Sequence, residues 1–188
     1  MMMVMKHHYF FAVKLPNEIK SFLNEWVQNN KKTFPFKRWV HEQDYHITLA
    51  FLGLVEKELL EKTIHSTKKL LEEQKFSLTL NKIGTFGAVK SPRIFWADVE
   101  DSEELNAVQR IVYNHCIDLG FELDKKPFRP HITLARKWDS EQPFQQQETF
   151  ITTEDGKKLI FTVDEIILYE SHVEETPKYK ELASFPLK

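Results

Sequence analysis

Several features are missing from this sequence, and each absence narrows the class of protein. Cys116 is the only cysteine, which excludes an internal disulfide and fits a reducing compartment. No apolar run approaches the roughly 20 residues that a membrane-spanning helix needs. The segment Met1–His8 lacks the charged-then-apolar order and the small-residue cleavage site of a signal peptide. We therefore expect a soluble protein of the cytoplasm.

A strong charge of either sign is also lacking. The 26 lysines and arginines nearly balance the 28 aspartates and glutamates, which gives a net charge of −2. Any basic binding surface must therefore be local. Aromatic residues, in contrast, make up 13% of the 188 residues, which is enough to build a folded core. The length suits one compact domain or two tightly joined lobes.

The pentapeptide His-Ile-Thr-Leu-Ala occurs twice, at residues 46–50 and 131–135. The offset between the copies is 131 − 46 = 85 residues, and it aligns two further pairs of segments without a gap. A period of this length indicates two related lobes of one domain, residues 1–188, with a pseudo-twofold axis between them. The further pairs are Tyr9–Val13 with Ile94–Asp98, and Phe76–Leu78 with Phe161–Val163.

The hydrophobic pattern predicts an α+β protein. Apolar residues at helical spacing predict three helices, one after Pro16, one over residues 57–74 and one after Ser102. Gly84–Gly87 is expected to end a strand. We expect two pseudosymmetric lobes whose antiparallel sheets form a central cleft, with the helices packed outside. The predicted strands are residues 9–15, 39–54, 76–83, 93–99, 163–170 and 180–187.

Each pentapeptide places a histidine and a threonine on one face of a strand, because residues i and i+2 point the same way. His46 with Thr48, and His131 with Thr133, would bring two such pairs into one cleft. Two imidazoles with a pKa near 6.5 supply an acid and a base at neutral pH. Threonine hydroxyls can donate hydrogen bonds to oxygens that gain charge in a transition state. This set suits in-line displacement at phosphorus without a metal or a covalent intermediate.

Basic residues gather around the second copy and indicate an anionic substrate. Arg136 lies five residues after His131, so strict alternation would aim it away from the cleft. It can contribute only if the strand ends or bulges near Ala135. The basic residues are Lys125, Lys126, Arg129, Arg136 and Lys137.

Other candidate side chains have ordinary explanations as well. Phe10, Phe51 and Phe128 flank the motifs and could stack on a base, but a phenylalanine is more often part of the core. A zinc site on His46 and His131 lacks a third ligand at a suitable spacing, so we predict no metal. His7, His8, His65 and His115 are assigned to surface or packing roles. His41 and His172 flank predicted strands and could line the cleft, but solvated loop positions are favoured for both.

The paired motifs resemble those of the two-histidine (2H) phosphoesterase superfamily, which carries His-x-Thr in each of two pseudosymmetric lobes. Wider stretches are similar to one branch, the bacterial and archaeal RNA 2′,3′-cyclic phosphodiesterases formerly called 2′-5′ RNA ligases. Nearly the whole chain takes part in this likeness. The stretches are residues 10–16, 38–40, 46–53, 127–136 and 163–171.

The resemblance implies an enzyme without cofactor that opens a 2′,3′-cyclic phosphate at an RNA 3′ end to a 2′-phosphomonoester. By position, His46 would protonate the departing 3′ oxygen, and His131 would activate the attacking water. Thr48 and Thr133 would hold the phosphate with help from Arg136. The partner would be an RNA 3′ end or an oligonucleotide, and the protein would act as a monomer.

Three points stay open at the level of sequence. The same site could act on 2′-5′ linked oligonucleotides or on small cyclic nucleotides, and joining 2′-5′ ends would be the reverse chemistry. A basic cleft could also bind RNA without catalysis. The two motifs are locally identical, so the residues themselves do not say which histidine is the acid.

Overall fold

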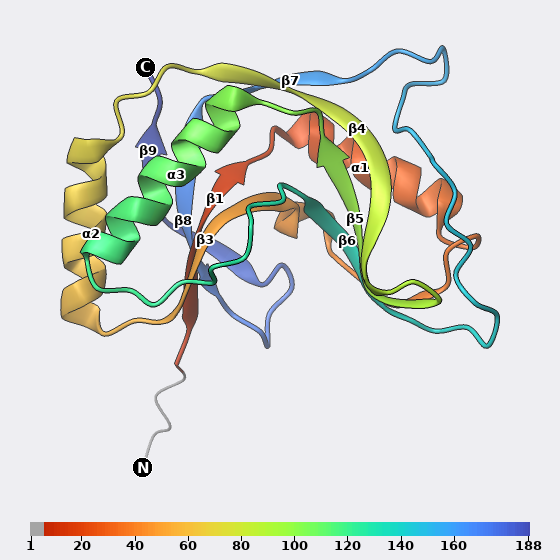
Figure 1. Cartoon of the computed structure of the whole chain (residues 1–188), viewed down its shortest axis with the longest axis horizontal. Coiled ribbons are helices and arrows are strands. Elements are labelled where there is room, and N and C mark those ends of the chain that lie inside the picture. Colours follow the sequence, from red (N-terminus) through yellow and green to blue (C-terminus); the bar gives the residue numbers. More distant parts are fainter. Residues whose placement is uncertain (1–5) are drawn as a thin grey trace.

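The protein is described by a computed structural model over residues 6–188 (Figure 1). Met1–Met5, part of the segment that lacks the features of a signal peptide, lies outside the described residues. The helices are α1 (Asn17–Asn30), the short 3-10 helix η1 (Glu42–Asp44), α2 (Lys57–Leu70) and α3 (Glu103–Asp118). The strands are β1 (His8–Lys14), β2 (Phe36–Trp39), β3 (His46–Leu54), β4 (Phe76–Ala88), β5 (Ser91–Val99), β6 (Ile132–Trp138), β7 (Ile160–Val163), β8 (Glu165–Ser171) and β9 (Tyr179–Pro186).

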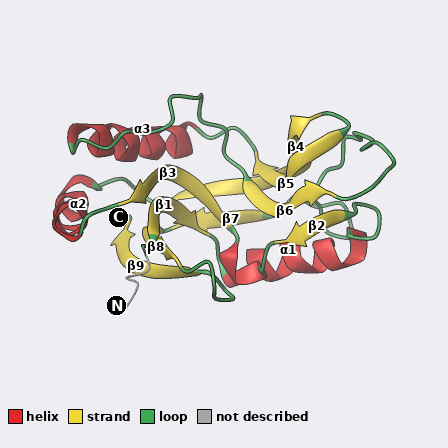
Figure 2. Cartoon of the chain, turned by 90° about the horizontal axis from the view of Figure 1, so that it is seen from below, coloured by secondary structure: helices red, strands yellow, loops and turns green. Residues whose placement is uncertain are grey.

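The strands form one antiparallel sheet, which confirms the predicted α+β class. The order is β7-β4-β5-β6-β3-β1-β8-β9, and β2 pairs with β6 beside this path. The two halves of the sheet are joined between β3 and β6 by a single residue pair, Ile47 with Ile132. In Figure 2, α2 and α3 lie on one side of the sheet and α1 on the other. Within residues 6–188, no helix is both long and apolar enough to cross a membrane.

Two strand pairings join residues that differ by 85 in number. Ile47 pairs with Ile132 in the middle of the sheet, and Ser77 of β4 pairs with Thr162 of β7. When an antiparallel pair lies on a twofold axis, the residue at the axis pairs with its own counterpart, and both of these pairs have the offset of 85 that such an axis requires. The starts of the two pentapeptide strands therefore lie side by side.

The prediction that Gly84–Gly87 ends a strand is wrong, because β4 continues through this segment to Ala88. Gly84 pairs with Trp96 of β5, and a Cβ atom on Gly84 would lie only 2.2 Å from the indole ring. Glycine inside a strand can mark such a close approach as well as an end. The strand predicted over 39–54 is also divided, because β2 ends at Trp39 and η1 precedes β3.

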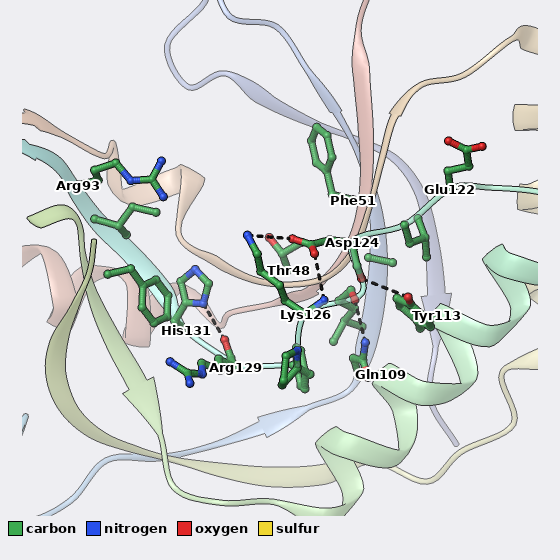
Figure 3. A pocket seen from close by; sticks show the side chains of 17 residues that line it. Thr48, Phe51, Arg93, Gln109, Tyr113, Glu122, Asp124, Lys126, Arg129 and His131 are labelled. Carbon is green, nitrogen blue, oxygen red and sulfur yellow. Dashed lines mark hydrogen bonds and ion pairs between the residues drawn. The ribbon is translucent and has the colours of Figure 1, made fainter. Parts of the chain in front are cut away.

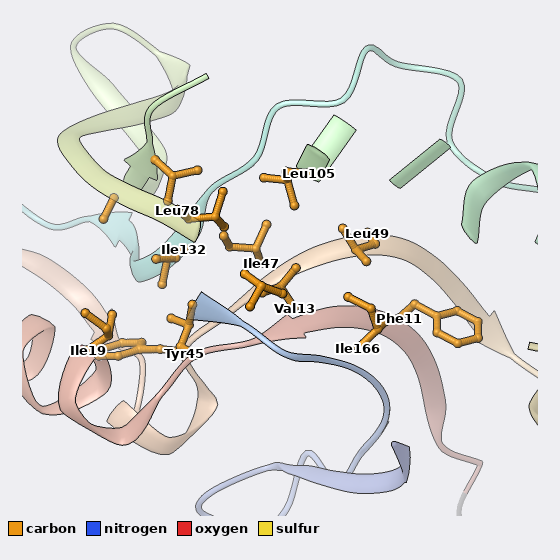
Figure 4. Close-up of a cluster of buried hydrophobic side chains, with 14 of the residues drawn as sticks. Phe11, Val13, Ile19, Tyr45, Ile47, Leu49, Leu78, Leu105, Ile132 and Ile166 are labelled. Atoms are coloured by element: carbon orange, nitrogen blue, oxygen red, sulfur yellow. The ribbon is translucent and has the colours of Figure 1, made fainter. Parts of the chain in front are cut away.

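The apolar residues of the pentapeptides anchor the two central strands in the core (Figure 4). Ile47 and Ile132 are fully buried, and Leu49 and Leu134 are at most 4% exposed. Burial of one such side chain contributes about 1.5–3 kcal/mol. A slip of one residue in register would expose all four, so their burial keeps the histidines and threonines on the opposite face.

Candidate active site

The motif side chains meet in one cavity of about 250 Å³, where β3 and β6 come together. His46 and Thr48 enter it from β3, and His131 and Thr133 from the start of β6. Arg136 also lines this cavity. The structure thus brings together the residues that were predicted to act on phosphate.

Arg136 reaches the cavity because β6 contains a bulge. Consecutive residues of β5 pair with Thr133 and with Ala135, so Leu134 is an extra residue. A bulge reverses the alternation beyond it. Leu134 and Ala135 are accordingly both buried, and Arg136 faces the same side as His131. The condition set by the sequence for a role of Arg136 is met.

The same irregularity occurs at the equivalent position of β3. Consecutive residues of β1 pair with Thr48 and with Ala50, which leaves Leu49 as the extra residue. Phe51 then faces the cavity and is 54% exposed. Because 51 + 85 = 136, Phe51 is the counterpart of Arg136. The two halves of the cavity therefore differ here, with an aromatic ring on one side and a cation on the other.

Backbone carbonyls hold both imidazoles in the same way. The Nδ1–H group of His46 donates to the carbonyl of Asp44 at 2.7 Å, and that of His131 donates to the carbonyl of Arg129 at 2.7 Å (Figure 3). A carbonyl can only accept, so the proton of each neutral ring lies on Nδ1 and Nε2 is the basic atom. Nε2 of His46 lies 3.0 Å from Oγ1 of Thr48. Both rings are thus prepared to exchange a proton through Nε2.

His46 is enclosed more tightly than His131. Its ring centroid lies 4.8 Å from that of Phe10 and 5.2 Å from that of Tyr179. His131 packs against one ring, that of Phe86, at 4.9 Å. Phe10 is only 3% exposed, so its ring supports the imidazole and leaves little surface for a nucleobase.

Burial lowers the pKa of His46 to about 4, and the positive charges of Lys20 and Arg136 add to this effect. Burial also lowers the pKa of His131, again with a contribution from Arg136. Both rings are therefore neutral in the free protein at pH 7. An anion between them would raise both pKa values, because it stabilises the protonated forms.

Asp44 is a positioning residue that the sequence did not reveal. It is 3% exposed, and its carboxylate accepts backbone hydrogen bonds from Lys178 and Tyr179 at 3.1 Å. Its carbonyl holds His46. One residue thus fixes both the segment before β9 and the imidazole. No local signal pointed to it, because its partners lie at least 134 residues away in the chain.

A larger cavity of about 870 Å³ adjoins the first one and extends toward α3 (Figure 3). It shares Phe51 and His131 with the smaller cavity. Phe128 and Arg129 line it, as does Lys126. A chain longer than one nucleotide could therefore continue from the motif residues along this surface.

The predicted basic cluster is divided by the structure. Arg136 lines the smaller cavity, and Lys126 and Arg129 line the larger one. Lys125 and Lys137 line neither. Sequence proximity to the motif therefore overstated how many of these cations face a substrate.

The chain matches known proteins over nearly its whole length. The family model described as the 2'-5' RNA ligase superfamily matches residues 10–175. An RNA 2',3'-cyclic phosphodiesterase of Geobacillus stearothermophilus is 43% identical over 183 residues, which is 97% of this chain and 58% of that protein. This chain thus spans little more than half of that relative. The protein of the same name from Bacillus subtilis is 31% identical over 181 residues, 96% of each chain.

Solved structures show the same fold. E. coli LigT complexed with 3'-AMP has a TM-score of 0.81 and 25% identity, covering 98% of this chain and 99% of that one. The protein TT0787 of Thermus thermophilus has a TM-score of 0.75 and 25% identity, with coverage of 95% and 97%. The paired motifs, the sheet order and these matches agree over nearly the full length, and the chain belongs to the 2'-5' RNA ligase superfamily.

Proposed function

We propose that this protein hydrolyses the 2′,3′-cyclic phosphate at an RNA 3′ end to a 2′-phosphomonoester, without a metal in the reaction. The observation that carries the proposal is the pair of imidazoles in one cavity, each with Nδ1 bound to a carbonyl so that Nε2 is the atom that can exchange a proton. The names of the two curated relatives support the reaction. The 3'-AMP complex of LigT supports a nucleotide ligand with a phosphate at the 3′ position.

In this reaction His46 is the acid and His131 the base. Nε2 of His131 takes a proton from water, whose oxygen attacks phosphorus. The bond from phosphorus to the 3′ oxygen breaks, and His46 gives that oxygen its Nε2 proton. His131 ends protonated and His46 neutral, and proton exchange with water restores the pair. This assignment is the one that the family resemblance gives by position. The more enclosed His46 is the stronger acid once it carries a proton, and the less enclosed His131 is the better base.

Thr48 changes its hydrogen bond with the protonation of His46. When the ring is neutral, the Thr48 hydroxyl donates to Nε2 across 3.0 Å. When the ring is protonated, Nε2–H donates to Oγ1, and the hydroxyl proton is free to bind a phosphate oxygen. Thr133 and Arg136 bind the other side of the phosphate. Protonation of His46 therefore both forms the acid and turns the Thr48 hydroxyl into a donor for the phosphate.

The size of the adjoining surface supports an RNA end over a small cyclic nucleotide. The larger cavity carries Arg93 and Arg129 beside the motif residues, and such cations bind backbone phosphates. Lys126 lines the same cavity but is paired with Asp124. We keep the sequence prediction of a monomer that acts in the cytoplasm. The only cysteine, Cys116, is buried and unpaired, which supports a reducing compartment.

Product identification tests the proposal directly. A short RNA ending in 2′,3′-cyclic phosphate is incubated with the protein in EDTA, and the product is assigned by phosphorus NMR. We expect a 2′-phosphate. A 3′-phosphate would contradict the direction of bond breaking, and no turnover would favour RNA binding without catalysis. Faster cleavage of a 2′-5′ linked oligonucleotide would show that this linkage is the preferred substrate of the same site.

Phe51 is expected to stack on the base next to the cyclic phosphate, since it is exposed in the cavity opposite Arg136. Phe51→Ala should raise KM by about 5- to 150-fold, the equivalent of 1–3 kcal/mol of stacking. Phe51→Tyr should keep most of the affinity. Steady-state kinetics on a cyclic nucleotide and on its abasic analogue would show the effect on the nucleotide alone.

Phe150→Ala is the matched control for this test, because Phe150 is 50% exposed and lines neither cavity. An equal loss on the abasic analogue would show that Phe51 does not bind the base.

The pH dependence should reflect the lowered pKa values of both histidines. The reaction needs one protonated and one neutral ring, so the rate falls below the lower pKa and above the higher one. In the free protein the pKa of His46 is about 4 and that of His131 is also lowered. Both limbs of the kcat/KM profile are therefore expected on the acid side of about pH 6.5.

The kcat profile should lie at higher pH than the kcat/KM profile, because the bound phosphate raises the pKa of both rings. Rates measured on one cyclic nucleotide across the acid and neutral range would give both profiles. A kcat/KM profile with its descending limb above about pH 8 would contradict the lowered values.

A further inference from the structure

Two histidines and a glutamate meet outside both cavities, at the start of β1 and the end of β8. His7, Glu170 and His172 each place one possible ligand atom within 4.8 Å of the others. Within residues 6–188, this is the one group of three or more such side chains. All three are partly buried. From the sequence, both histidines were expected at the surface, because His7 lies near the start of the chain and His172 follows a predicted strand.

A backbone carbonyl orients His7. Its Nδ1–H group donates to the carbonyl of Ser171 at 2.9 Å. This bond places the proton on Nδ1, so Nε2 keeps its lone pair and can bind a metal ion. The His7 ring lies against that of His172, with the centroids 4.1 Å apart.

Polar partners orient the other two side chains as well. One carboxylate oxygen of Glu170 accepts from the Tyr9 hydroxyl at 2.9 Å. Its other oxygen lies 2.6 Å from Nε2 of His172, and Nδ1 of His172 lies 3.3 Å from a carboxylate oxygen of Glu175. Metal-binding histidines and carboxylates are usually held by such outer hydrogen bonds. Each of the three candidate ligands has one.

We propose that His7, Glu170 and His172 bind a divalent transition metal ion of the zinc type. Two imidazoles and one carboxylate, with a fourth position for water, form a known ligand set for zinc. The ion would take the place of the hydrogen bond between Nε2 of His172 and Glu170, and the ring would carry its proton on Nδ1, toward Glu175. The site is separate from the proposed reaction, which needs no metal.

The ion would join the start of the described chain to the segment that ends at the active site. His172 begins the turn that leads to Lys178 and Tyr179, whose backbone N–H groups Asp44 holds. Ser171 lines the smaller cavity. The expected effect is therefore a more stable protein with a better fixed cavity wall.

The competing explanation is an ion pair without metal, in which a protonated His172 lies between Glu170 and Glu175. That explanation gives Nε2 of His7 no role. It predicts that neither the unchanged protein nor His7→Ala binds zinc, whereas the metal site binds zinc and loses a ligand in His7→Ala.

The test uses the untagged, full-length protein after removal of metal with EDTA. Titration with zinc chloride in a calorimeter should show one site, and cobalt(II) should give the visible absorption of a four-coordinate ion. At a hundredfold excess of zinc over Kd, the melting temperature should rise by about 5–10 °C. His172→Ala and His7→Ala should each weaken binding at least a hundredfold. Tyr9→Phe should weaken it by about 10-fold through the lost outer hydrogen bond.

His65→Ala is the control, because His65 is exposed on α2. The zinc affinity of this variant should equal that of the unchanged protein. His7 lies next to the end of the described chain, so its variant should fold even if His172→Ala does not. No zinc binding up to the millimolar range would overturn the proposal. Binding that survives both His7→Ala and His172→Ala would also overturn it. Turnover of cyclic phosphate in EDTA is measured separately, so either proposal can fail alone.

Discussion

Replacing His46 or His131 by alanine is expected to lower kcat on an RNA 2′,3′-cyclic phosphate by about 10²–10⁴-fold. Each ring exchanges one proton with the reacting atoms through Nε2, and alanine removes that group. KM should change little, because Thr133 and Arg136 still hold the phosphate. The double variant should lose little more than either single one, since groups that act as a unit are not additive. Initial rates with purified variants would measure all three effects.

A sulfur substrate separates the acid from the base. When sulfur replaces the 3′ oxygen, the leaving thiolate needs no proton. His46→Ala should then recover most of its rate, and His131→Ala should not, because water must still lose a proton. Recovery by His131→Ala instead would reverse the assignment. His65→Ala, on the exposed face of α2, is the matched control. A loss below tenfold for both His46→Ala and His131→Ala would contradict the mechanism.

Arg136→Ala is expected to lower kcat/KM by about 10²–10³-fold, as the loss of one donor to a developing oxyanion does. The bulge at Leu134 turns the guanidinium into the cavity, where it can bind two phosphate oxygens at once. The kcat/KM of Arg136→Lys should lie between those of the unchanged protein and Arg136→Ala, because an ammonium group keeps the charge but lacks the planar guanidinium fork. Added guanidinium should restore part of the activity of Arg136→Ala.

The control for Arg136 is Arg110→Ala, since Arg110 is exposed on α3 and lines neither cavity. If Arg136→Ala loses activity that guanidinium does not restore, and its melting temperature is lower, Arg136 has a structural role. Equal losses in both arginine variants would point to general attraction of the anion rather than to a bound phosphate.

The motif residues were predictable because their signal is local. Alternation in a strand places His46 with Thr48 on one face and Ile47 with Leu49 on the other, whatever the rest of the chain does. Duplication at a constant offset added the expectation that the two strands meet. The pairing of Ile47 with Ile132 is what that expectation describes.

Other features depended on contacts between distant segments. The bulges at Leu49 and Leu134 arise from pairing with β1 and β5, and they turn Phe51 and Arg136 into the cavity against strict alternation. Gly84 lies within a strand, and its lack of a Cβ atom leaves room for the Trp96 ring of the neighbouring strand.

The sequence alone was enough to identify two equivalent histidine and threonine pairs and the family to which they point, because strand periodicity and repetition are properties of the chain. It did not distinguish the two histidines, since their neighbours along the chain are the same. The folded protein makes them different. Phe10 and Tyr179 enclose His46 more than Phe86 encloses His131, and burial sets how readily each imidazole holds a proton.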